Sequence, residues 1–391
     1  MEIQLRKLSN YIKPRLEKMN KLGGKIDLLV VTHIDKDHIE GILELFKDNS
    51  DNETSSIIKI NEVWHNSYRH LSIQDNGNDL EESNKRILED IISKYSSKTR
   101  ANKNELKDIS AKQGTTLGSY LIRGQYDWNK RFNYEAILYR DDSKISLSEN
   151  IHIKILCPDL DDLDKLKNIW YKYVKTFSRK IKLNRNEFFD DAYEYYLKNV
   201  EEIEKNYAVK NISSRKVEEP LDIACYTDSK VKSDKSGVNK SSIAFILEIF
   251  ELKFLFLGDA PDEKIVDKLK VYYKEDEFPI KFNGIKVAHH GSKYNNLSGI
   301  FDIAFSDTYF ISTDGTKNNH PHTETIAKIV TEQIGSNKNL IFNYNLSDKI
   351  WNLEVNSEKY KYKNYYPLSE KSITNIVYSN NEEEVEVNYI D

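Results

Sequence analysis

Several apolar segments of this chain end abruptly in histidine or aspartate, and this recurrence limits the folds open to it. In the segment 28–42, "LLVVTHIDKDHIEGI", a strand-like apolar run gives way to a cluster of imidazoles and carboxylates. Four further segments end in the same way, at His65, at Asp259, at His289 and His290, and at His320 and His322. An α/β layer gathers strand ends along one edge of a sheet, so we expect these side chains to converge.

The spacing of apolar residues predicts an alternation of helices and strands. Residues 3–22 and 39–46 have the three-to-four-residue spacing of helices, and another helix is expected after Thr323. The clearest strand signal is a hairpin over 241–260, with its turn near 251–253. Shorter segments also have strand character, namely 25–33, 57–67, 134–140, 151–159, 282–292, 307–315, 340–345 and 349–355. This alternation is typical of an α/β fold.

Two long polar segments interrupt the alternation. Residues 75–130 and 161–219 are rich in charged side chains and have helical character, so we interpret them as helical insertions. The core that remains lies at about 25–70, 130–165 and 220–370. We expect residues 1–370 to form a single domain and residues 371–391, which contain "NNEEEVEV", to form an acidic, solvated tail.

Composition indicates a soluble protein of a reducing compartment. Charged residues make up 31% of the chain and hydrophobic ones 39%, and no apolar run is long enough to span a bilayer. The basic N-terminal residues lack the apolar segment of a secretory signal. Cys157 and Cys225 are far apart and form no disulfide framework. We therefore expect a cytoplasmic protein without membrane contact, and its net charge of -5 argues against wholesale coating of nucleic acid.

The residue types at the first strand end suit a metal site. His33 and Asp35 alternate along the chain and can point to one side if strand geometry continues through them. Asp37 and His38 begin the next loop or helix. Imidazole and carboxylate bind divalent transition metals. Two such ions can clamp the attacking and leaving oxygens of a phosphoester.

Five motifs, taken in order, resemble the metallo-β-lactamase-fold hydrolases, and most closely the branch typified by the hydrolase domain of the ComEC competence protein. They are "HIDKDHIEG" (33–41), "NKSSIAF" (239–245), "FLGDA" (256–260), "VAHHGSK" (287–293) and "NHPH" (319–322). The resemblance covers roughly residues 25–70 and 130–330 without the two insertions. It implies an αββα sandwich carrying helical insertions.

The resemblance also implies a role for each matching residue in a site with two metal ions. The implied ligands are His33 and Asp35 for the first ion, Asp37 and His38 for the second, and Asp259 as the bridge. One of His289 and His290, preferably His290, would face the metals, and His320 would close the site. His65 is a further candidate ligand. A carboxylate at position 35, where the superfamily has a second histidine, favours Mn²⁺, with Zn²⁺ as the alternative.

The implied activity is that of a metallo-hydrolase cleaving phosphodiesters, and a nuclease acting on DNA or RNA is the first expectation. A metal-activated hydroxide would attack phosphorus, with Asp37 orienting the water and His320 and Ser292 neutralising the phosphate oxygens. One alternative is a small-molecule phosphodiesterase acting on a cyclic nucleotide or a phosphorylcholine-type ester. Another is a non-catalytic binding or scaffold member of the fold in a bacterial defence system.

A basic and aromatic strip over 171–185 offers a contact for nucleic acid. Its cations are Lys172, Lys175, Arg179, Lys180, Lys182 and Arg185, and no acid interrupts them. They alternate with Tyr171, Tyr173 and Phe177, a pattern that can follow a phosphate backbone and stack bases. A solvated helix face would have the same composition. The insertions could also provide a surface for a protein partner.

Ordinary structural roles compete with the functional ones. Asp37 is a candidate N-cap for the helix that follows it. Asp259 and Ser292 are of the residue types found in turns. We expect His70 and His152, which lie away from the strand ends, to have structural or surface roles.

Overall fold

The computed structural model describes most of the chain, in two compact units. The described residues are 8–71, 80–96, 115–141, 144–179, 181–208, 222–227, 231–316, 318–331, 337–352, 354–369, 373–378 and 385–390. Unit 1 comprises Met1–Ile137 and Asp159–Ser213, and unit 2 comprises Leu138–Pro158 and Ser214–Asp391. The single domain expected for residues 1–370 stays a prediction.

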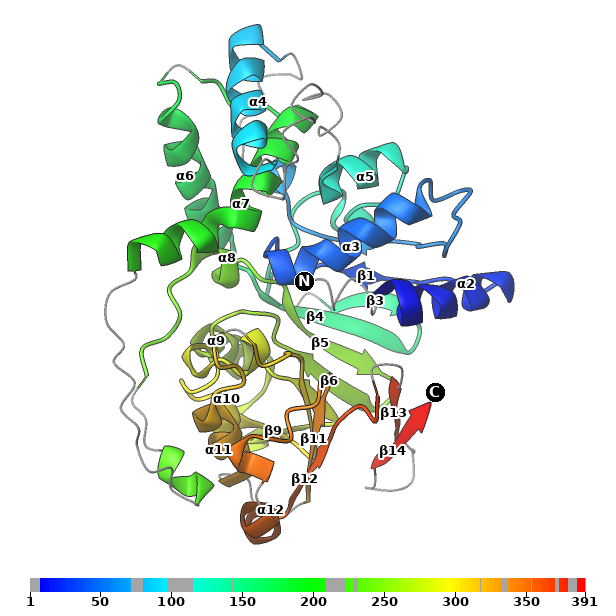
Figure 1. Ribbon diagram of the computed structural model, residues 1–391, viewed down its shortest axis with the longest axis vertical. Helices are drawn as coiled ribbons and strands as arrows, with labels where there is room; N and C mark the ends of the chain where they lie inside the picture. The colour runs from blue at the N-terminus through cyan, green and yellow to red at the C-terminus, as the bar shows by residue number, and fades with distance from the viewer. Residues whose placement is uncertain are drawn as a thin grey trace. The chain divides into compact units, whose positions relative to one another are not determined.

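Unit 2 is built on a mixed sheet of eight strands in the order β12-β11-β10-β8-β6-β5-β4-β3 (Figure 1). In chain order these strands are β3 (Lys144–Ser148), β4 (Ile151–Cys157), β5 (Ala244–Ile249), β6 (Leu252–Phe256), β8 (Gly284–Lys286), β10 (Thr308–Ile311), β11 (Lys338–Phe342) and β12 (Tyr362–Tyr365). The strands β6, β8 and β10 are parallel neighbours. Their carboxyl ends therefore share one edge of the sheet. The predicted hairpin is confirmed, because β5 and β6 are antiparallel partners.

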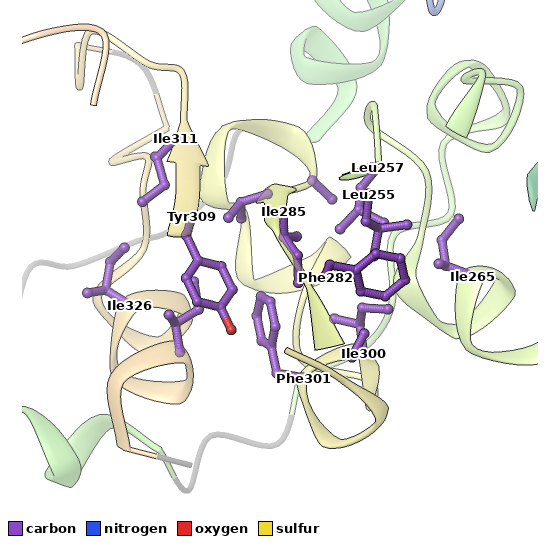
Figure 2. Close-up of a cluster of buried hydrophobic side chains, with 14 of the residues drawn as sticks. Leu255, Leu257, Ile265, Phe282, Ile285, Ile300, Phe301, Tyr309, Ile311 and Ile326 are labelled. Carbon is purple, nitrogen blue, oxygen red and sulfur yellow. The ribbon is translucent and has the colours of Figure 1, made fainter. Parts of the chain in front are cut away.

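Helices of unit 2 pack on this sheet around a buried apolar cluster. They are α9 (Asp262–Tyr272), α10 (Ile300–Ile303), α11 (Thr323–Thr331) and α12 (Glu354–Tyr360), and unit 2 also contains the short helix α8 (Gly237–Lys240). In Figure 2, Leu255, Ile285 and Tyr309 of three neighbouring strands lie with Ile300 and Phe301 of α10. This packing holds the ends of β6, β8 and β10 in place, since buried side chains are close-packed and resist displacement.

Unit 1 is mainly helical in its described part. It contains a π-helical turn (Leu8–Ile12) and the helices α2 (Lys13–Lys21), α3 (Lys36–Asn49), α4 (Glu82–Ser96), α5 (Leu117–Arg123), α6 (Leu160–Lys175) and α7 (Glu187–Ala208). Two short parallel strands, β1 (Leu29–Val30) and β2 (Val63–Trp64), form its sheet. The expected insertions 75–130 and 161–219 supply α4 with α5 and most of α6 with α7. Their predicted helical character is thus confirmed for the residues described.

Smaller elements complete the two units. Strands β7 (Ile280–Phe282) and β9 (Ala304–Ser306) pair with each other. Short 3-10 helices lie at Tyr68–His70, Lys130–Phe132, Ile223–Tyr226, Glu275–Glu277, His289–Gly291, Lys293–Asn295 and Ile350–Asn352.

Three local predictions are corrected by the structure. Residues 134–140 form no strand, and 349–355 begin a 3-10 helix followed by α12 instead of a strand. The expected solvated tail contains an antiparallel hairpin, β13 (Ile373–Tyr378) with β14 (Val385–Ile390). The hairpin contacts the main sheet through Tyr378, whose ring lies edge-on to Phe254 with centroids 5.1 Å apart. The acidic run suggested exposure, but the apolar positions beside it form a strand pair.

The described fold is a mixed α/β arrangement, as predicted, whereas the αββα sandwich stays a prediction. Among the described residues, no helix is both long and apolar enough to cross a membrane.

Candidate metal centre

Two candidate ligands of unit 1 follow neighbouring strands. Strands β1 and β2 pair in parallel with Leu29 opposite Val63, and the pairing continues as Val31 N donates to Trp64 O at 2.9 Å. His65 directly follows β2, and His33 follows β1 after Val31 and Thr32, so both come after the carboxyl ends of parallel strands at the same edge of the sheet. Within unit 1, two of the histidines that we expected to lie near one another thus follow strands that end at the same sheet edge.

His33 and His38 place their imidazole rings together at the start of α3. The ring centroids are 4.1 Å apart, and Thr32 Oγ1 lies 3.1 Å from Nδ1 of His33 and 3.5 Å from Nδ1 of His38. Because the hydroxyl lies on the Nδ1 side of both rings, Nε2 is the expected ligand atom of each. Asp35 is buried, and its Oδ2 is 3.5 Å from His33 Nε2. Two imidazoles and a carboxylate are thus within one short segment.

The structure argues against helix capping as the explanation of these aspartates. The N-cap position of α3 is Asp35, not Asp37, and Asp35 makes no side-chain cap hydrogen bond. Asp37 lies in the first turn with its side chain 40% exposed, and its Oδ2 is 4.0 Å from His38 Nε2. The N-cap alternative for Asp37 is therefore wrong, because the helix begins two residues earlier.

His65 is fully buried in unit 1 and rigidly held. Its backbone N–H donates to Asn129 Oδ1, and its carbonyl accepts from Trp128 Nε1 at 2.8 Å. Its Nε2 lies 3.4 Å from Glu194 Oε1, but neither ring nitrogen has a hydrogen-bond partner in the described part of the chain. His70 is different, since its Nδ1 accepts from the Ser67 backbone N–H at 3.1 Å. This contact matches the structural role predicted for His70.

In unit 2, Asp259 and His289 follow the adjacent strands β6 and β8. The His289 backbone N–H donates to Gly258 O at 2.9 Å, and the Asp259 N–H donates to Ser242 Oγ at 3.0 Å. Gly258 has a φ of +54°, a left-handed conformation that favours glycine. This turn brings Asp259 Oδ2 to 3.6 Å from His289 Nε2. The two predicted ligands therefore meet within one unit.

Asp234, which was not among the predicted site residues, lies behind His289. Its Oδ2 is 3.6 Å from His289 Nδ1 and accepts hydrogen bonds from Asn239 Nδ2 at 2.6 Å and Asn295 Nδ2 at 3.0 Å. Burial raises the pKa of Asp234, but the hydrogen bonds from His289 and these neighbours outweigh it and hold the pKa at about 2. Asp234 is therefore an anion at neutral pH.

His290 and His320 extend this cluster of imidazoles. The His320 ring lies 5.2 Å from that of His289 and 6.1 Å from that of His290. His290 Nδ1 is 2.5 Å from Ser312 O, an acceptor, so His290 carries its proton on Nδ1 and its Nε2 is the basic nitrogen. Burial, followed by repulsion from His289, His322 and His290, lowers the pKa of His320 to about 3. His320 is thus neutral at pH 7, the state that binds metals.

The backbone around His290 is unusual. His289, His290 and Gly291 have consecutive φ values of +42°, +56° and +85°. A Cβ at Gly291 would lie 2.5 Å from the side chain of Pro321. Strained left-handed backbone in non-glycine residues concentrates at functional sites, where packing must hold it. Here the packing against Pro321 links the "HHGS" and "NHPH" segments.

Ser292 and His322 have contacts that suit supporting roles. Ser292 is buried, its N–H donates to His289 O at 2.8 Å, and its carbonyl accepts from Asn296 Nδ2. His322 Nδ1 accepts from the Lys293 N–H at 3.2 Å. These contacts favour the turn alternative for Ser292, whose predicted catalytic role stays untested.

Some side chains of the basic and aromatic strip pack against other residues of unit 1. Tyr173 stacks on Tyr196 with ring centroids 4.1 Å apart, and Lys175 Nζ lies 4.0 Å from the ring centre of Tyr171. Phe177 is 39% exposed. The exposed cations of the strip are Lys172, Lys175, Arg179 and Lys182. Arg185 is half-buried, with its Nη1 3.8 Å from Glu135 Oε1, and Lys180 lies outside the described residues.

Sequence reasoning overlooked the residues that hold the histidines in place. Thr32 could have been noticed as the residue before His33, and Asn239 as the first residue of a matching motif. Asp234 and Glu194 carried no signal, because their proximity to His289 and His65 depends on contacts across 55 and 129 positions of the chain. Compared with known families and with curated proteins, the chain matches no family model and no curated protein.

The donor chemistry of these groups fits divalent transition metals. Neutral imidazoles and ionised carboxylates are the ligands that Mn²⁺ and Zn²⁺ accept. In both units, imidazole Nδ1 atoms face protein groups, which is the usual arrangement of a metal-binding histidine. Unit 1 offers His33, Asp35, Asp37, His38 and His65, and unit 2 offers Asp259, His289, His290 and His320.

Proposed function

We propose that this protein is a metal-dependent phosphodiesterase, specifically a nuclease. Each unit presents donor groups that suit a divalent ion. In unit 1 the imidazoles of His33 and His38 lie together, and the carboxylate of Asp35 lies beside His33. In unit 2 the carboxylate of Asp259 lies beside the imidazole of His289.

One observation carries this proposal most strongly. In unit 2, His289 lies with its Nε2 3.6 Å from Asp259 Oδ2, while hydrogen-bonding groups surround its Nδ1. The orientation of a ligand histidine by a partner on its other nitrogen is a common feature of metal sites and is not needed for simple packing. The low pKa of His320 adds a neutral imidazole beside this pair.

The side chains support a division of roles. Two divalent ions, when bound, supply Lewis acidity and lower the pKa of water at the site. Asp35 and Asp259 supply negative charge at buried positions. Asp37, the most exposed carboxylate of the first motif, can orient a water molecule and hold the proton that it releases. His320, which stays neutral, can donate a hydrogen bond to a phosphate oxygen.

A nucleic acid is the substrate that the charge distribution supports. The exposed cations Lys172, Lys175 and Arg179 can contact consecutive phosphates, and Phe177 is exposed enough to stack on a base. Tyr173 stacks on Tyr196, so we do not assign it a base-stacking role. We therefore assign the strip mainly to the phosphate backbone, which predicts weak sequence preference.

The proposal is tested by measuring metal content and hydrolysis in Asp259→Asn and in a matched control, Asp276→Asn. Asp276 is exposed and belongs to the same unit. The wild type and Asp276→Asn should each hold about two equivalents of manganese or zinc and cleave plasmid DNA, single-stranded DNA or RNA. Asp259→Asn should lose metal and activity while keeping its circular dichroism spectrum.

Two results would count against the proposal. A wild-type protein that retains no metal after reloading with Mn²⁺ or Zn²⁺ would support a scaffold role. Cleavage of bis(p-nitrophenyl) phosphate without cleavage of any nucleic acid would place the enzyme among small-molecule phosphodiesterases.

A further inference from the structure

The carboxylate of Asp234 anchors a hydrogen-bonded network behind His289. Its Oδ1 accepts from the Ser236 backbone N–H at 2.8 Å, and its own N–H donates to Tyr294 O at 2.9 Å. Its Oδ2 accepts from the side-chain amides of Asn239 and Asn295. The carboxylate is thus held at both oxygens by neighbours in unit 2.

The network determines the orientation of the Asn295 amide. Asn295 Nδ2 lies 3.0 Å from Asp234 Oδ2 and 3.0 Å from Asp259 O. Both of these atoms are acceptors only, so they require the NH₂ end of the amide. The oxygen of Asn295 must therefore point the other way, where it lies 3.0 Å from His289 Nδ1.

The orientation of Asn295 in turn selects the protonation state of the histidine ring. Two amides compete for Nδ1 of His289, because Asn295 Oδ1 lies 3.0 Å from it and Asn239 Nδ2 lies 3.3 Å from it. An amide oxygen can only accept a hydrogen bond, so the shorter contact, to Asn295, favours a proton on Nδ1. Nε2 is then the basic nitrogen, and it is the one that faces Asp259 Oδ2. The alternative tautomer, with the proton on Nε2, could not bind a metal through that atom.

The Asp234 carboxylate also determines the orientation of the Asn239 amide. Its Nδ2 faces Asp234 Oδ2 at 2.6 Å, although this orientation leaves its buried Oδ1 without a hydrogen-bond partner among the described residues. A flipped amide would set its oxygen against the carboxylate. Repulsion between the two acceptors explains why the unsatisfied arrangement is kept.

We propose that Asp234 is a positioning residue that, through Asn295, selects the Nδ1–H tautomer of His289 and so makes Nε2 its ligand atom. The metal-binding consequence rests on the proposed function, whereas the tautomer selection does not. If the carboxylate is removed, only Asp259 O still holds the NH₂ end of Asn295, so a flip of the amide costs one hydrogen bond instead of two. The flipped amide would present its NH₂ to Nδ1 and stabilise the other tautomer.

The test is ¹⁵N nuclear magnetic resonance of protein labelled in its nine histidine rings. His289→Gln identifies the His289 signals by their loss. In the metal-free wild type we expect a protonated Nδ1 and a deprotonated Nε2 for His289. In Asp234→Asn we expect a mixture of tautomers or the Nε2–H form. Asp276→Asn is the control, because Asp276 is an exposed aspartate of the same unit.

Metal titration provides the second readout. Asp234→Asn should weaken Mn²⁺ or Zn²⁺ binding by about 10- to 100-fold, as loss of a partner behind a ligand histidine usually does, while Asp234→Glu should recover part of this loss. Asp276→Asn should retain the wild-type tautomer and metal affinity.

The outcomes separate the two proposals. An Nε2–H tautomer in the wild type overturns the inference without any variant, so the test does not depend on the folding of Asp234→Asn. An unchanged tautomer in folded Asp234→Asn overturns it as well. A changed tautomer in the variant supports the inference, and if the wild type then binds no metal, the proposed function fails alone.

Discussion

Nε2 of His65 lies 3.4 Å from Oε1 of Glu194, a residue of the polar segment that the sequence suggested was an insertion. Glu194 also accepts from Ser67 Oγ at 2.7 Å and from the Leu117 N–H at 2.8 Å, at the start of α5. All of these groups are buried in unit 1. Helix α7 is therefore tied to a candidate metal ligand by a carboxylate.

Glu194→Gln should destabilise the protein by about 1–3 kcal/mol. The glutamine keeps the volume but turns an NH₂ group toward a buried donor that the carboxylate satisfied. Glu187→Gln, at an exposed position of the same helix, should change stability by less than about 0.5 kcal/mol. Urea unfolding of the three proteins measures the difference, and equal midpoints would show that Glu194 is not a structural anchor.

Asp37→Asn should abolish most of the hydrolysis with little effect on folding. Its side chain is 40% exposed, so the amide costs little stability. A carboxylate that orients water and accepts a proton typically contributes about 10²- to 10⁴-fold to the rate. Glu44→Gln, on the same helix, is the control and should keep wild-type activity. Initial rates on single-stranded DNA decide the matter: if both variants remain active, Asp37 has no catalytic role.

The stability of unit 1 should depend on pH through Asp190. Burial raises the pKa of Asp190 to about 6, against the opposing effect of the Arg69 guanidinium, compared with 3.8 for an exposed aspartate. Between these two values the folded state holds a proton that the unfolded chain has released. The contribution of Asp190 to stability therefore falls as pH rises from about 4 to about 6.

This dependence can be isolated with Asp190→Asn, which does not titrate. The free energy of unfolding of the wild type relative to this variant should decrease over that pH range, by roughly 1.4 kcal/mol for each unit of pKa shift. Urea unfolding at pH 4, 5, 6 and 7 provides the values. A constant difference would mean that the pKa of Asp190 is the same in the folded and the unfolded protein, as expected if Arg69 fully compensated burial.

Removing cations from the basic strip should weaken nucleic-acid binding without affecting chemistry. The double variant Lys175→Ala with Arg179→Ala should bind single-stranded DNA less tightly, and the slope of log K against log salt should become shallower by about 0.7 per lost phosphate contact. Lys165→Ala is the control, since Lys165 lies on the same helix and pairs with Asp161. Hydrolysis of a small phosphodiester should not change in either protein, and an unaltered salt slope would exclude the strip as a binding surface.

The residues themselves determined much of the local structure and the list of candidate ligands. Two strongly apolar segments around a short turn predicted the β5–β6 hairpin, and the predicted helices at 39–46 and after Thr323 are α3 and α11. These signals are local, since a strand or helix repeats over a few residues. Histidines and aspartates at strand ends were recognisable because parallel strands bring their carboxyl ends to one edge, as β6 and β8 do for Asp259 and His289.

Tertiary structure alone decided which groups stand behind those ligands. Asp234 reaches His289, and Glu194 reaches His65, through contacts whose partners are remote in sequence. The position of Asp35 as N-cap of α3 and the contact of the terminal hairpin with Phe254 were also visible only in the structure. Apolar periodicity specifies which side of an element is buried. The residues that contact this buried side depend on how distant elements pack and on which buried polar groups can form hydrogen bonds with one another.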